Sequence, residues 1–453
     1  MSVVVIGGGP AGMRAAEALV AAGLRPLLLD EAPRTGGQGY RKPHPALALD
    51  MPRLLGGQHG EHERLHAAFA AIAGRVDHRP GALVFAVEPG RLHVLREGRV
   101  EVAAYERLIV ASGATDRVAP MPGWTLPGVF TLGGAQLALK DQGCLIGPRV
   151  AFAGSSPLLL LAAAQYRRMG GTVVGVFDET SLPRKIAAAP KLARSPGTLA
   201  LGLSLSHELR RAGVPVRLGA RLLRIDGERR VEALILRDRA GGEERIACDA
   251  VALGHGLKPE TQLAELAGAR FAFDATTRLW APVFDADGRA APGLYLAGDG
   301  AAIGGAQAAQ ASGALAALAA LKDMGQAVDE ARADELRRTV ARLRAFQRGI
   351  AEAFAWPAAR VGALPDDCML CRCENVTAGD IRAAVASELI PAEVNRVKAI
   401  TRCGMGRCQG RFCGPALQEI VAAASGRPVA EVGRLRGQAP VKPIPLSSAE
   451  GAP

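Results

Sequence analysis

Six of the eight cysteines in this 453-residue chain lie between Cys368 and Cys413, and their spacing could build a metal centre. Cys371 and Cys373 form a C-x-C pair, and Cys408 and Cys413 form a C-x4-C pair further along the chain. The N-terminus enters an apolar run by its third residue without a basic segment, so we expect no secretory signal. In such a chain, clustered thiols argue for a metal over disulfides.

The spacing of these cysteines favours an iron-sulfur cluster over structural zinc. A C-x-C pair holds two sulfurs closer along the chain than the C-x2-C knuckle usual for zinc, whereas four cysteine thiolates are the ligands of a 2Fe-2S cluster. A helix predicted over residues 416–424 would begin beside Cys413, where its dipole stabilises a negatively charged cluster. A zinc site remains the alternative, and it would use a different set: Cys368, Cys371, Cys403 and Cys408.

A second constellation, at the start of the chain, could hold phosphates. Residues 3–6 are β-branched and read as a buried parallel strand, and Gly7, Gly9 and Gly12 follow at once as G-x-G-x-x-G. Such glycines allow a tight turn and let the backbone approach a pyrophosphate. Pro10 and Ala11 complete this turn, and the helix predicted over residues 13–22 would direct its positive end at the phosphates.

A carboxylate stands at the spacing expected for binding the adenosine ribose. The second strand, over residues 27–29, ends in Asp30, which lies eighteen residues after Gly12. This distance is near the one found in dinucleotide-binding βαβ units, and Glu31 is the substitute for the same role. The first thirty residues therefore predict a dinucleotide site.

Three further polar glycine turns follow predicted elements of the same unit. Gly37 and Gln38 form a turn that could lie against a flat ring system, and Ser112 and Gly113 end a buried strand. Asp299, after Gly298, precedes a small-residue helix over residues 305–321 and is placed to accept hydrogen bonds from a ribityl chain, with helix capping as the alternative. Val84, in an alternating antiparallel stretch, completes the predicted cofactor contacts.

A second βαβ unit, over residues 150–177, has a degraded glycine turn. Gly154 keeps the first position, but Ser156 and Leu159 replace the other two glycines and would crowd a pyrophosphate. We therefore predict poor nicotinamide binding there. His255, between two glycines and without an acid partner in the sequence nearby, is interpreted as a turn residue rather than a catalytic base.

Composition limits the remaining classes of function. The net charge of +11 comes from scattered arginines without interleaved aromatic residues, so a solvated surface is favoured over a nucleic-acid site. A basic surface could steer an acidic protein partner. No run of about twenty apolar residues predicts a membrane span, and we expect a cytoplasmic protein.

The two nucleotide units, with the second inserted between Gly113 and Gly298, resemble the two-dinucleotide-binding-domain flavoproteins of the thioredoxin reductase and glutathione reductase class. The resemblance implies that the glycine turns and Asp30 surround FAD. Residues 1–321, which carry this resemblance, contain Cys144 and Cys248 but no C-x-x-C pair. This excludes the dithiol chemistry of that class. No residue of the chain is predicted to act as a catalytic acid or base.

The segments CRCENVTAGDI and TRCGMGRCQGRFCG resemble the bacterioferritin-associated-ferredoxin-like 2Fe-2S domain. With the front part, the chain resembles the FAD subunit of heteromeric amine-oxidising dehydrogenases, among them opine oxidase, D-hydroxyproline dehydrogenase and hydrogen cyanide synthase. The resemblance implies a hetero-oligomer with a second FAD-containing subunit that oxidises the amine, and it allows a small third subunit. It also implies four cluster ligands: Cys371, Cys373, Cys408 and Cys413.

We therefore expect an α/β chain with two interleaved Rossmann-like domains and a small helical 2Fe-2S domain, acting as an electron-transfer subunit with FAD. The expected domains are an FAD domain (1–120 and 246–325), a second nucleotide domain (121–245), a helical linker (326–365), a 2Fe-2S domain (366–436) and a tail (437–453). Two alternatives stay open: a self-sufficient NAD(P)H-dependent ferredoxin-type reductase, and a nucleotide-binding scaffold for a catalytic partner.

Overall fold

The first layer of the computed structural model, which describes residues 2–238, 240–387 and 390–451, is a six-stranded sheet. Its central strand β1 (Val3–Ile6) pairs in parallel with β2 (Leu27–Asp30) and β7 (Arg107–Val110). These short runs are apolar and buried, as strands covered on both faces must be. The sheet is completed in the order β20-β21-β7-β1-β2-β3 by β3 (Asp77–Pro80), β20 (Arg289–Ala291) and β21 (Leu294–Leu296).

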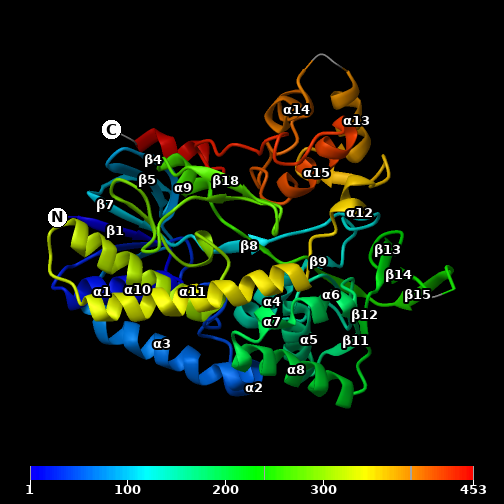
Figure 1. Cartoon of the computed structure of the whole chain (residues 1–453), viewed down its shortest axis with the longest axis horizontal. Coiled ribbons are helices and arrows are strands. Elements are labelled where there is room, and N and C mark those ends of the chain that lie inside the picture. The colour runs from blue at the N-terminus through cyan, green and yellow to red at the C-terminus, as the bar shows by residue number, and fades with distance from the viewer. Residues whose placement is uncertain (1, 239, 388–389, 452–453) are drawn as a thin grey trace.

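Small residues allow the helices on one face of this sheet to pack closely. α1 (Pro10–Ala21) lies beside α10 (Gly305–Asp323), and α3 (His59–Ile72) lies beneath them (Figure 1). At Gly313 a Cβ atom would stand 2.0 Å from the carbonyl oxygen of Ala11, so this crossing requires glycine. An antiparallel meander covers the other face: β4 (Leu83–Glu88), β5 (Arg91–Arg96) and β6 (Arg99–Ala104).

The second sheet is five-stranded and parallel, in the order β12-β11-β10-β16-β9. Its strands are β9 (Val129–Thr131), β10 (Arg149–Gly154), β11 (Thr172–Asp178), β12 (Val216–Leu218) and β16 (Ala250–Gly254). The predicted boundary at residue 246 placed the strand 250–254 in the first domain, whereas β16 pairs with β10 and β9 in the second sheet. We therefore propose that the second domain extends to about residue 254.

Helices and a small antiparallel sheet surround the second sheet. The helices are α4 (Leu132–Gln142), α5 (Leu158–Arg168), α6 (Leu182–Ala187), α7 (Ala189–Leu192) and α8 (Pro196–Arg211), and the strands are β13 (Arg221–Asp226), β14 (Ala233–Arg237) and β15 (Glu243–Ala247). Short connecting elements complete both units: α2 (Met51–Leu55), α9 (Gln262–Leu266), β8 (Ala114–Asp116), β17 (Leu257–Pro259), β18 (Phe271–Asp274) and β19 (Leu279–Pro282). Asp50 caps α2 by accepting from the Arg53 amide at 2.9 Å.

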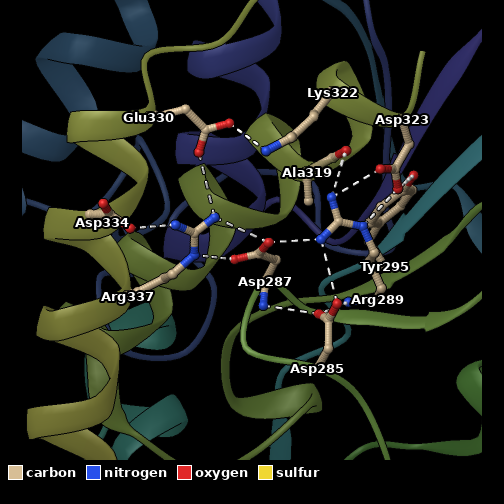
Figure 2. Close-up of polar contacts among 10 residues, drawn as sticks. All are labelled: Asp285, Asp287, Arg289, Tyr295, Ala319, Lys322, Asp323, Glu330, Asp334 and Arg337. Carbon is tan, nitrogen blue, oxygen red and sulfur yellow. Dashed lines mark hydrogen bonds and ion pairs between the residues drawn. The ribbon is translucent and has the colours of Figure 1, made fainter. Parts of the chain in front are cut away.

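The helix α11 (Glu330–Ala353) runs from the first unit to α6 and α7 of the second (Figure 1). Figure 2 shows the polar network that fixes its first half. Arg337 of α11 donates to Asp287 at 2.5 Å, and Asp287 also accepts from Arg289 at 2.7 Å. Arg289 in turn binds both carboxylate oxygens of Asp323 at the end of α10. The charges thus join α11, α10 and β20 into one body.

A small helical unit with a two-stranded ribbon holds the clustered cysteines. It contains α12 (Ala358–Gly362), β22 (Met369–Cys371), β23 (Val376–Thr377), α13 (Ala378–Ala386), α14 (Val394–Thr401) and α15 (Gly414–Ser425). The tail then returns to the first unit (Figure 1), where the Val441 amide donates to the Phe85 carbonyl at 2.8 Å. Among the helices of the described residues, none has the length and apolar character needed to cross a membrane.

Candidate cofactor sites

Two positions of the first glycine turn require glycine, Gly7 for its backbone conformation and Gly12 for lack of space. Gly7 has φ +101°, and a Cβ there would stand 2.3 Å from the Ala111 carbonyl oxygen. At Gly12 a Cβ would stand 1.8 Å from the Gly7 carbonyl oxygen, which closes the helix onto the strand. Gly9 caps α1, whose first residue is Pro10, so the first amides of the helix remain free for phosphate. This cradle fits the pyrophosphate of FAD.

Asp30 is the carboxylate that faces this turn. A Cβ at Gly8 would stand 2.3 Å from Asp30 Oδ2, and this oxygen is buried without a hydrogen-bond partner in the described chain. Burial raises the pKa of Asp30 to about 6. A buried carboxylate with an unused acceptor fits the ribose hydroxyls of FAD. Glu31 instead forms an ion pair with Lys442 of the tail, so its substitute role lacks support.

The other predicted contacts gather around the same turn. A Cβ at Gly37 would lie 3.0 Å from Gly9 Cα, so the turn that precedes the exposed Gln38 packs directly on the glycine turn. A Cβ at Gly300 would lie 2.6 Å from Ser112 Oγ and 3.0 Å from the Gly113 amide. Three strand ends therefore meet where an extended dinucleotide would lie, although direct contact with FAD stays a prediction for each residue.

Two predicted contacts have structural partners of their own. The Asp299 carboxylate accepts from the Gly304 and Gly305 amides at 2.8 and 3.0 Å, which is the capping alternative at the start of α10. The Gly298 amide donates to Ser312 Oγ at 2.9 Å within the same helix start. The Val84 side chain is buried in the hydrophobic cluster beneath the meander, so only its backbone could face a cofactor.

The second glycine turn is not open to a nucleotide, because the chain itself covers it. We call residues 354–360, between α11 and the middle of α12, the plug segment. Ser155 Oγ, in the turn after β10, donates to the Ala355 carbonyl oxygen at 2.9 Å. Trp356 lies edge-on to His255 with ring centroids 6.1 Å apart. Both turns follow neighbouring strands at the carboxyl edge of the sheet, where ligands of such folds bind.

An acid just after the second strand of this unit is also occupied. Glu179 follows β11 and accepts from Arg360 of the plug segment at 3.1 and 3.2 Å. His255 Nε2 lies 3.0 Å from Glu179 Oε2, so the histidine does have an acid partner. This pair could not be predicted from the sequence, because 76 residues separate the two side chains. Burial alone would raise the pKa of Glu179. The hydrogen bonds and positive charge of His255 and Arg360 outweigh burial, and the net effect is a lowered pKa.

The predicted metal centre is assembled from three segments of the cysteine-containing unit. Ligand atoms of Cys371, Cys403 and Cys413 lie within 4.8 Å of one another, and all three residues are buried. Cys371 ends β22, Cys403 follows α14, and Cys413 is the N-cap of α15. Cys373 and Cys408 line one cavity with Cys371 and Cys413, so five cysteines gather here, and we call them the sulfur group.

This sulfur group fits a metal better than it fits free thiols. Hydrogen bonds from Cys403 and Cys413 hold the pKa of Cys371 far below its ordinary value, and the Cys413 thiol lowers the pKa of Cys408 to about 5, while the same contacts raise the pKa of Cys403 and Cys413. Cysteine sulfurs gathered at such proximity are the donors that a 2Fe-2S cluster requires. Cys403 lies closer to the centre than its spacing predicted, and which four cysteines bind stays a prediction.

Cys368 is separate from this group. Its thiol is buried, burial raises its pKa to about 11, and no other thiol contributes to that shift. Cys371, Cys373, Cys408 and Cys413, the four predicted iron-sulfur ligands, line one cavity, and Cys368, which the zinc alternative needs, is not among its lining residues.

A cavity of about 490 Å³ opens between the sulfur group and the first unit. Trp124, from the connection to the second unit, donates its indole N–H to the Met369 carbonyl at 2.7 Å beside this cavity. Cysteines, basic residues and the tail share the lining: Glu31, Leu83, Trp124, Leu370, Cys371, Arg372, Cys373, Arg407, Cys408, Arg411, Phe412, Cys413, Lys442 and Pro443. Glu31 follows Asp30, so this cavity places the sulfur group near the carboxyl end of β2.

Buried ion pairs position the cysteine-containing unit, and sequence reasoning missed them. Arg411, two residues before Cys413, donates to both oxygens of Glu260 at 2.7 and 3.1 Å. Arg434 binds Glu265 of α9 in the same bidentate manner, at 2.7 and 2.9 Å. The partners are 151 and 169 residues apart, and no local pattern signals such pairs.

Comparisons with known proteins agree with both sites. Residues 1–313 match the family model of pyridine nucleotide-disulphide oxidoreductases, and residues 369–423 match the BFD-like 2Fe-2S binding domain. These matches confirm the predicted cofactors, FAD and a 2Fe-2S cluster, and the α/β fold.

Relatives match the chain over nearly its whole length. An opine oxidase subunit of Rhizobium meliloti is 36% identical, with 98% of this chain and 86% of the relative covered. The hydrogen cyanide synthase subunit HcnB of Pseudomonas aeruginosa is 35% identical, with 98% and 97% covered. The solved L-proline dehydrogenase of P. horikoshii shares the fold with a TM-score of 0.73 at 20% identity, covering 99% of this chain and 78% of that one. The chain therefore belongs to the pyridine nucleotide-disulphide oxidoreductase family, in the group that carries a C-terminal BFD-like 2Fe-2S domain and includes the opine oxidase relative.

Proposed function

We propose that this chain is the FAD- and 2Fe-2S-containing electron-transfer subunit of a heteromeric dehydrogenase that oxidises an amino acid, an imino acid or an opine. The observation that carries the proposal is the cavity that Cys371 and Cys413 line together with Glu31, the neighbour of the proposed ribose carboxylate Asp30. The sulfur group and the FAD cradle thus belong to one body. FAD supplies two-electron chemistry and can pass electrons singly to a one-electron cluster.

The chain's own residues bind and position the cofactors. Gly7, Gly9 and Gly12 admit the pyrophosphate, and Asp30 accepts from the ribose hydroxyls. Arg411 holds the loop before Cys413 against Glu260, and its guanidinium also donates to the Cys408 carbonyl at 3.3 Å. This contact couples the position of a sulfur ligand to the first unit, so the distance between the two cofactors is set by a buried ion pair.

The relatives suggest how the amine is oxidised. The opine oxidase and hydrogen cyanide synthase relatives are each named as one subunit of their enzyme, so these enzymes contain more than one kind of chain. We propose that a second FAD-containing subunit oxidises the amine and that a small third subunit can complete the assembly. The self-sufficient NAD(P)H reductase is disfavoured, because the plug segment uses Ser155 and Glu179 at the second turn.

Reconstitution with the native partner tests this proposal. A tagged chain purified anaerobically from its host should bring down a second flavoprotein, and amine substrate should bleach the visible absorbance of this chain only when that flavoprotein is present. Opines, D- and L-amino acids and cyclic imino acids should be offered in parallel to find the substrate. Amine oxidation by this chain alone, or a cluster that stays oxidised while the partner turns over, would contradict the proposal.

A further inference from the structure

Three histidines follow one another along the start of α3 at three- and four-residue spacing, which places them on one face of the helix. The His59 and His62 rings are stacked 6.2 Å apart, and the His62 and His66 rings lie 4.6 Å apart. His62 is buried, with 2% of its surface exposed. Neither predicted cofactor site uses these side chains.

The segment 62–66 reads H-E-x-x-H, a pattern in which two histidines bind zinc. Here the second histidine is occupied, because His66 Nε2 lies 2.8 Å from the Tyr40 carbonyl oxygen. One ligand atom from each of His59, His62 and Glu63 instead lies within 4.8 Å of the other two. These residues stand at i, i+3 and i+4, so one helical turn brings all three together.

Two nitrogens of this group lack partners. His59 Nδ1 and His62 Nε2 are buried and make no hydrogen bond to any described residue. A buried polar atom without a partner costs about 1–3 kcal/mol, so such atoms usually mark an unseen ligand. His62 also lines a cavity of about 350 Å³, together with Glu63 and Lys42.

We propose that His59, His62 and Glu63 form a binding site for a divalent transition metal of the zinc class. Two imidazoles and a carboxylate are a ligand set that zinc accepts, and three protein ligands leave a fourth position for water or a ligand in the cavity. Arg34 lines the same cavity, but its charge is matched by Asp141 at 2.6 Å. Lys42 also lines the cavity and has no ion pair among the described residues, so its positive charge should repel a bound metal ion.

The test uses the full-length protein with its 2Fe-2S cluster in place and Zn²⁺ alone as the probe. Wild type should retain one zinc per chain after dialysis, in addition to the iron. His59→Ala and Glu63→Gln should each weaken binding at least about 100-fold, since even loss of a second-shell partner costs roughly 10–100-fold. Lys42→Ala should tighten zinc binding, because it removes a positive charge from the cavity. His207→Ala, at an exposed histidine of α8, is the matched control and should bind as wild type.

Cobalt separates this site from the cysteines. Co²⁺ bound at His59, His62 and Glu63 should give weak visible bands without the intense near-ultraviolet charge-transfer band of thiolate ligands. Circular dichroism of each variant checks that the helix is intact. The proposal is overturned if no zinc binds beyond that held by cysteines, or if binding survives unchanged in both the His59→Ala and the Glu63→Gln variants.

Discussion

Replacing Arg360 with alanine should loosen the plug segment that covers the second nucleotide turn. Removing one partner of a buried ion pair costs about 3–5 kcal/mol, because the remaining charge is left uncompensated. The Arg360 side chain is 23% exposed and that of Glu179 is 13% exposed, so water compensates part of this cost. We therefore expect the lower end of the range, about 3 kcal/mol.

Hydrogen exchange of the amides in residues 354–360 measures this change directly. A loss of about 3 kcal/mol corresponds to exchange on the order of 100-fold faster, if the segment opens without global unfolding. Arg338→Ala is the matched control, because Arg338 is exposed on α11 and has no ion pair among the described residues. Unchanged protection in Arg360→Ala would show that the ion pair does not hold the segment.

The same reasoning predicts slow reduction of the flavin by NADH and NADPH in stopped-flow mixing. Wild type should bleach slowly because Ala355 and Arg360 occupy the groups that would bind the nucleotide. Arg360→Ala should remain slow, since Ser156 and Leu159 still replace the glycines of the turn. Rapid, saturable bleaching of wild type by either nucleotide would refute the argument and revive the reductase alternative.

Three further predictions concern the cofactors. Gly12→Leu should abolish FAD binding, because even a Cβ there would meet the Gly7 carbonyl oxygen at 1.8 Å; a yellow variant with full flavin content would contradict this. FAD affinity should rise between pH 5 and pH 7. The pKa of the Asp30 carboxyl is raised to about 6, so this group is protonated below that range and ionised above it. The affinity of the Asp30→Asn variant should depend less on pH. Two irons and acid-labile sulfide per chain are expected, with cluster loss in Cys413→Ser, mild effects in Cys403→Ser and none in Cys368→Ser. Zinc without iron, or a cluster lost in Cys403→Ser but kept in Cys413→Ser, would show that the ligand set is wrong.

The parts of the fold that could be predicted are those that depend on patterns among neighbouring residues in the sequence. The strand, glycine turn and helix of the first unit lie within the first thirty residues, and β1, α1 and β2 form where their patterns indicate. The helix begins at Pro10 rather than at residue 13, because proline is favoured in the first turn and its missing N–H has no partner there anyway.

The parts that could not be predicted depend on contacts between distant residues. His255 looked like a turn residue because Glu179 and Arg360, its partners, lie 76 and 105 residues away. The tail, residues 437–453, was given no predicted contact, yet Val441 is buried against the first unit. Cys403 looked like a bystander because spacing along the chain says nothing of which sulfurs meet in space.

The degraded nucleotide turn and the cysteine-containing unit are parts of one arrangement. The carboxyl edge of a parallel sheet presents unpaired polar groups that must be satisfied when no ligand binds. Here the plug segment satisfies them and leads directly into α12, so the second sheet anchors the start of the cysteine-containing unit. Arg411 and Arg434 anchor the same unit to Glu260, after β17, and to Glu265 of α9, which packs against β4 of the first unit. Attachment to both units restricts rotation of the cysteine-containing unit more than a single hinge could, and residues so fixed would hold a bound cluster in one position relative to a bound flavin.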